Sequence, residues 1–76
     1  MSGLKCLDET MWELHLLAKT NGWEVDGHKN GWKIEDGVET ISINTRINGV
    51  RVKVSEVFTG QETKARIINK VKLVIK

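Results

Sequence analysis

The stretch Ile41–Val54, ISINTRINGVRVKV, decides the fold of this chain. Apolar and polar side chains alternate on both sides of Asn48-Gly49, a dipeptide that readily adopts the two positive-φ conformations of a tight hairpin turn. A two-residue turn pairs Ile47 with Val50, position 45 with 52, and position 43 with 54. In this register the apolar side chains share one face and the polar side chains the other. We therefore predict an antiparallel hairpin with one buried face.

A helix is predicted near the N-terminus. Its apolar residues recur every three or four positions and so share one helix face: Leu4, Leu7, Met11, Leu14 and Ala18, with Leu17 at the margin. Ser2 or Asp8 is expected to cap the start of the helix. Asn21-Gly22 is expected to end it, because glycine accepts the left-handed conformation that follows a last helical turn.

Trp12 and Leu16 do not fit that face. They lie four residues apart and are therefore neighbours on another side of the helix. Two interpretations stay open: the sheet curves around the helix and covers them, or they form an exposed apolar pair that docks a partner.

Two short strands are predicted between the helix and the hairpin. Residues 23–26 (WEVD) and 32–35 (WKIE) alternate apolar and charged side chains, and the turn-forming segment 27–31 joins them. Asp36-Gly37 forms the next turn. Trp23 and Trp32 fall in the inward register, so both are expected to pack in the core.

The C-terminal segment, residues 63–75, fits either a strand or a helix. Its β-branched residues favour a strand, in which Lys64, Arg66, Lys70, Lys72 and Lys76 point outward. A helix would begin with a capping box at residues 59–62, but its apolar face would contain Lys64 and omit Leu73. We favour the strand. The predicted fold is a single small α+β domain, residues 1–76, with one N-terminal helix packed on a four- to five-stranded antiparallel meander sheet.

Composition limits the class of protein. The chain has 76 residues, 39% hydrophobic and 29% charged, which is ordinary for one globular domain. Its single cysteine, Cys6, cannot form an internal disulfide, so we expect a reducing, cytoplasmic location. No stretch approaches the length of a membrane span, and attachment to anionic lipid ranks last among the possible interactions.

Charge is divided unevenly along the chain. Residues 1–40 hold eight acids and four bases, a net charge of −4, whereas residues 41–76 hold eight bases and two acids, a net charge of +6. If the last segment is a strand, one sheet face carries a basic patch without an acid: Arg46, Arg51, Lys53, Lys64, Arg66, Lys70, Lys72 and Lys76. Lysines of this kind often serve only to prevent edge-to-edge aggregation. The alternative, which we favour for function, is non-enzymatic binding to the phosphate backbone of DNA or RNA.

Catalysis and cofactor binding are not expected. His15, His28 and Cys6 do not have the spacing of metal ligands, and no phosphate-binding Gly-rich loop precedes a helix. Cys6 is interpreted as a small packing residue.

The rival hypothesis is protein–protein interaction. Trp12 and Leu16, or the acidic N-terminal half, would dock a partner or form a homodimer. The chain would then act as a small inhibitor or adaptor of the kind that mobile genetic elements encode.

Overall fold

The central hairpin forms in the predicted register. In the computed structural model, which describes residues 2–75, β3 (Val38–Ile47) and β4 (Val50–Val57) pair antiparallel, with Ile47 opposite Val50 and Ile43 opposite Val54. Asn48 and Gly49 take φ values of 52° and 79°, the positive values expected for this turn. Asp36-Gly37, directly before β3, has a similar pair of positive φ values, 52° and 76°. Both turns therefore confirm the prediction.

The N-terminal helix, α1 (Gly3–Asn21), also has the predicted ends. The Oγ of Ser2 accepts a hydrogen bond from the Lys5 N–H at 3.2 Å, and Gly22 follows the last turn in the left-handed conformation. The buried face is shifted from the prediction, because Cys6 and Thr10 are fully buried whereas Leu4 is exposed. The Thr10 hydroxyl donates to the Cys6 carbonyl at 2.7 Å, which satisfies its hydrogen bonding inside the core.

The two short strands β1 (Val25–Asp26) and β2 (Gly31–Glu35) do not pair with each other, unlike the predicted meander. Both pair antiparallel with β3, β1 with residues 46–47 and β2 with residues 38–42, on the edge that β4 leaves free. The intervening residues stay attached to β3. The Lys29 N–H donates to the Asn44 carbonyl at 2.7 Å, and the side chain of Asn30 accepts from the Asn44 N–H at 3.1 Å. These contacts keep the chain running along β3.

The C-terminal segment is a helix, α2 (Glu62–Ile75), so the favoured strand prediction is wrong and its alternative holds. Thr63, Ile67, Ile68 and Val71 are buried, with the spacing of one helix face. Two features counted against a helix: Lys64 within the apolar face and Leu73 outside it. Both are compatible with the observed helix. Lys64 lies at the side of this face, where it pairs with acids of α1, and Leu73 points outward with 70% of its surface exposed.

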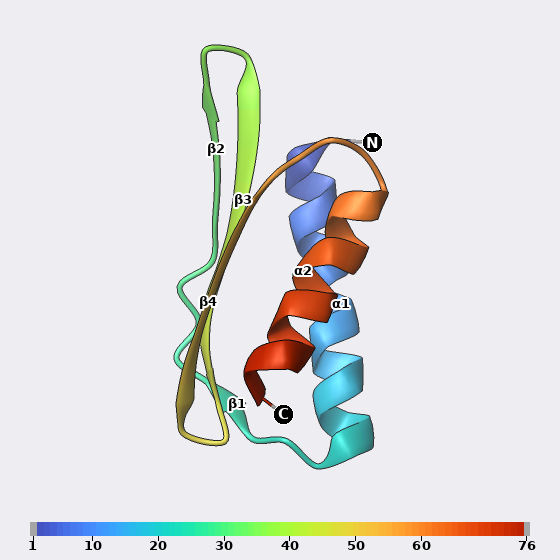
Figure 1. Ribbon diagram of the computed structural model, residues 1–76, viewed down its shortest axis with the longest axis vertical. Coiled ribbons are helices and arrows are strands. Elements are labelled where there is room, and N and C mark those ends of the chain that lie inside the picture. The colour runs from blue at the N-terminus through green and yellow to red at the C-terminus, as the bar shows by residue number, and fades with distance from the viewer. Residues whose placement is uncertain (1, 76) are drawn as a thin grey trace.

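The molecule has two layers (Figure 1). Helices α1 and α2 lie side by side on one face of the four-stranded antiparallel sheet and run in the same direction, while no helix of the described residues covers the other face. The core between the layers is formed mainly by Leu7, Leu14, Ile41, Ile43, Ile47, Val52, Ile67 and Val71. Trp23 packs against this core as predicted, but Trp32 is exposed and is not part of it, so its predicted core position is wrong. Within residues 2–75, no helix is both long and apolar enough to cross a membrane.

Candidate binding surfaces

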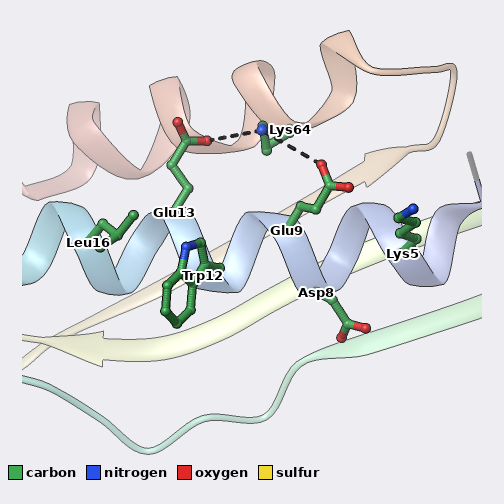
Figure 2. A pocket seen from close by; sticks show the side chains of 7 residues that line it. All are labelled: Lys5, Asp8, Glu9, Trp12, Glu13, Leu16 and Lys64. Carbon is green, nitrogen blue, oxygen red and sulfur yellow. Dashed lines mark ion pairs between the residues drawn. The ribbon is translucent and has the colours of Figure 1, made fainter.

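The outward side of α1 carries an open groove of about 540 Å³. Trp12 lies in it with 68% of its surface exposed, and Leu16 lies next to it with 49% exposed. Figure 2 shows the lining residues: Lys5, Asp8, Glu9, Trp12, Glu13 and Leu16 of α1, and Lys64 of α2. We call this surface the Trp12 groove. The two residues that the sequence singled out for protein docking are thus brought together.

The groove exists because α1 is covered on one side only. Leu7, Leu14 and Ala18 face the sheet, which places Trp12 on the opposite side of the helix. The sheet does not curve far enough to reach that side. Of the two interpretations of Trp12 and Leu16, the exposed apolar pair is therefore the one observed.

One wall of the groove is an ion-paired contact between the helices. The Nζ of Lys64 lies 3.9 Å from a carboxylate oxygen of Glu9 and 3.8 Å from one of Glu13 (Figure 2). Trp12 and Asp8 point away from α2 in the same view. Lys64 is therefore occupied within the molecule and joins α2 to α1.

The predicted eight-residue basic patch does not form. Arg46, Arg51 and Lys53 project from the uncovered sheet face, since each alternates with a buried residue of β3 or β4. The other described members lie on α2, behind the opposite sheet face: Lys64, Arg66, Lys70 and Lys72. Lys76 lies outside the described residues. The patch needed a C-terminal strand, and the helix removes its third row of charges.

Two of the α2 cations are bound to Glu56 of β4. Glu56 lies opposite Ile41, so its side chain is on the helix-covered face and only 13% exposed. Hydrogen bonds from Lys70 and then from Arg66 lower the pKa of Glu56 below its ordinary value. Arg66 also donates to the Val57 carbonyl and to the Thr59 hydroxyl, each at 3.0 Å. Arg66 and Lys70 thus anchor α2 to β4.

The three cations on the uncovered sheet face form a smaller cluster, which we call the Arg46–Arg51–Lys53 cluster. Arg46 and Arg51 are direct cross-strand neighbours, an arrangement of like charges that destabilises a sheet. Arg46 lies 3.7 Å from a carboxylate oxygen of Asp26, and Arg51 donates to the side chain of Asn44 at 3.1 Å. Lys53 has no ion pair within residues 2–75.

A contact that sequence spacing did not reveal joins the two histidines. The ring centroids of His15 on α1 and His28 in the β1–β2 connection lie 5.3 Å apart. His28 Nδ1 is 3.2 Å from the hydroxyl of Thr45. The contact depends on the path of residues 27–30 along β3, which local sequence does not predict. Across residues 2–75, no group of three or more His, Cys, Asp or Glu side chains is arranged to hold a metal ion.

Comparison of the chain with protein-family models, with curated proteins and with solved structures gives no match. Function is therefore inferred from the two surfaces described above.

Proposed function

We propose that the chain is a non-enzymatic protein-interaction module, of the inhibitor or adaptor type, that docks a partner through the Trp12 groove. The observation that carries this proposal is the exposure of the Trp12 indole beside Leu16 in an open groove. Exposed tryptophan is enriched at the centres of protein interfaces, where its burial gives a large part of the binding energy. The free, buried thiol of Cys6 supports a cytoplasmic location for this module.

The test compares two double variants that each remove two exposed apolar side chains. W12A/L16A removes the groove side chains, and L73A/V74A removes two exposed side chains at the far end of α2. A partner captured from extracts of the native cell is identified, purified and titrated against each variant. We expect W12A/L16A to weaken binding by about tenfold or more and L73A/V74A to leave it within about twofold. Equal losses in both variants would contradict the proposal.

We propose as a second function that the Arg46–Arg51–Lys53 cluster binds nucleic-acid phosphates. The observation that favours it is the direct opposition of Arg46 and Arg51 on an uncovered sheet face, beside Lys53. A phosphate between such cations offsets their mutual repulsion, and the release of counterions makes its binding more favourable. The neighbouring hydroxyl and amide side chains of Ser42, Asn44 and Ser55 are suited to donate hydrogen bonds to phosphate or sugar.

The salt dependence of binding tests this second function. Three phosphate contacts predict a log–log slope of about −2 to −3 for duplex or single-stranded DNA or RNA between about 50 and 200 mM salt. R51Q and K53Q should each reduce the slope by about one. The matched control is K72Q, which removes an exposed lysine from α2. No binding at low salt, or the same loss with K72Q, would reject this function.

A further inference from the structure

The Trp12 groove combines an apolar centre with a negatively charged border. Asp8, Trp12 and Leu16 follow each other at intervals of four, so they form one row along α1. Glu9 and Glu13 form the neighbouring row. An aromatic ring is therefore flanked by an acid one turn before it and by an aliphatic side chain one turn after it.

The acids are not fully neutralised within the molecule. The groove is lined by three carboxylates and two ammonium groups, which leaves it a net charge of −1. Lys64 is shared by Glu9 and Glu13 at distances close to 4 Å. Asp8, one turn before Trp12 in the same row, has no ion pair within residues 2–75. The potential around Trp12 therefore favours a cation.

We infer that the groove binds a basic segment of its partner protein, with an arginine or lysine against the Trp12 indole and Asp8 and an aliphatic side chain against Leu16. This inference rests on the docking function proposed above and specifies the chemistry of the partner. An indole attracts a cation through its negatively charged ring face, and nearby carboxylates strengthen that attraction. The row Asp8–Trp12–Leu16 matches a helical segment that presents a cation and an aliphatic residue one turn apart.

Three labelled synthetic peptides of equal length test the inference by fluorescence anisotropy with the full chain. The first repeats arginine and leucine four residues apart on an alanine and glutamine background. The second replaces each arginine with glutamate, and the third replaces each leucine with serine. We expect the first peptide to bind about tenfold more tightly than either of the others at low salt.

A matched pair of charge variants locates the effect. D8N removes the acid one turn before Trp12, and D36N makes the same change in the β2–β3 turn, where asparagine tolerates the observed positive φ. We expect D8N to weaken binding of the first peptide by about two- to fivefold, D36N to leave it unchanged, and W12A to abolish it. Circular dichroism and urea denaturation confirm that each variant is folded.

The outcomes separate the two proposals. If the first and second peptides bind equally well and both are lost with W12A, the docking function stands and the basic partner is rejected. Binding of the first peptide that survives W12A, or is equally weakened by D36N, also rejects the inference. Sedimentation analysis is run in parallel, and a W12A-sensitive dimer without peptide binding would assign the groove to a second copy of the chain. No binding of any peptide also overturns the inference.

Discussion

The carboxylate of Glu56 accepts a hydrogen bond from the Nε of Arg66 at 2.9 Å, and this ion pair joins the end of β4 to α2. Lys70 donates to the other carboxylate oxygen. Glu56 is mostly shielded from water, whereas both cations are partly exposed. Loss of the two cations would therefore leave a shielded carboxylate without a counterion, whereas loss of Glu56 would leave two cations that water can partly hydrate.

Replacing Glu56 with glutamine should lower the free energy of unfolding at neutral pH by about 1–2 kcal/mol, because two charge-assisted hydrogen bonds lose their anion at a partly exposed site. Urea denaturation measures this change. The matched control is E35Q, which breaks the exposed pair of Glu35 with Lys33 and should cost less than about 0.5 kcal/mol. Equal costs would show that the Glu56 contacts do not hold α2.

Acid should remove the same contribution. The pKa of Glu56 is lowered from its ordinary value of 4.5 in the folded chain, first by Lys70 and then by Arg66. The unfolded chain therefore takes up the proton first as the pH falls. The contribution is complete above about pH 4.5 and is lost as the pH falls through the lower folded pKa. We expect unfolding titrations below pH 5 to show a steeper loss of stability for the natural chain than for E56Q, and parallel curves would contradict this.

Substitution of Gly3 by alanine should destabilise the start of α1. The Gly3 N–H and the Trp32 Nε1 both donate to Oε1 of Glu39 at 2.9 Å, and a Cβ at position 3 would lie 2.5 Å from that oxygen. Displacing the carboxylate from this helix N-terminus should cost about 1–2 kcal/mol. Denaturation of G3A, E39A and the double variant checks the mechanism. The two effects should be strongly non-additive, and additivity would show that Gly3 acts in another way.

Alanine substitutions of two leucines of α1 should separate effects on stability from effects on partner binding. Leu14 is 1% exposed in the core, so L14A should lower the free energy of unfolding by about 2–4 kcal/mol. Leu16 lies in the Trp12 groove, so L16A should cost less than about 1 kcal/mol while weakening partner binding. Thermal and urea denaturation measure the first difference. A large stability loss for L16A would mean that Leu16 is a core residue.

The opposed arginines predict a stabilising substitution. R51E places an acid directly opposite Arg46, which should raise the free energy of unfolding by about 0.2–1 kcal/mol relative to K53E at low salt. K53E is the matched control because its cross-strand neighbour is the uncharged Asn44. The advantage should decrease at high salt. No difference between the two variants would show that repulsion between Arg46 and Arg51 does not destabilise the sheet.

The elements that local sequence determines were predicted correctly. Asn48-Gly49 fixes the turn of the β3–β4 hairpin, and alternation on both sides of it fixes the register. Ser2 and Gly22 likewise mark the ends of α1. In each case the residues that predict a turn or a helix end lie within a few positions of that turn or end.

The features that were missed depend on distant partners. Lys64 counted against a helix because the acids that pair with it, Glu9 and Glu13, lie far away in the sequence. The path of β1 and β2 depends on Asn30 binding the backbone of Asn44. The predicted basic patch required residues 63–75 to form a strand. It does not form because these residues are the helix α2, which the distant acids of α1 help to stabilise. Trp12 and Leu16 were identified correctly as neighbours, but their exposure depended on how far the sheet curves.

Because both helices cover the same side of the sheet, the Trp12 groove and the Arg46–Arg51–Lys53 cluster face opposite directions across a molecule that is 18–19 Å thick. Ligands on the two sides would not collide. A ternary complex, with this chain as the bridge between a polypeptide and a polyanion, is therefore sterically allowed.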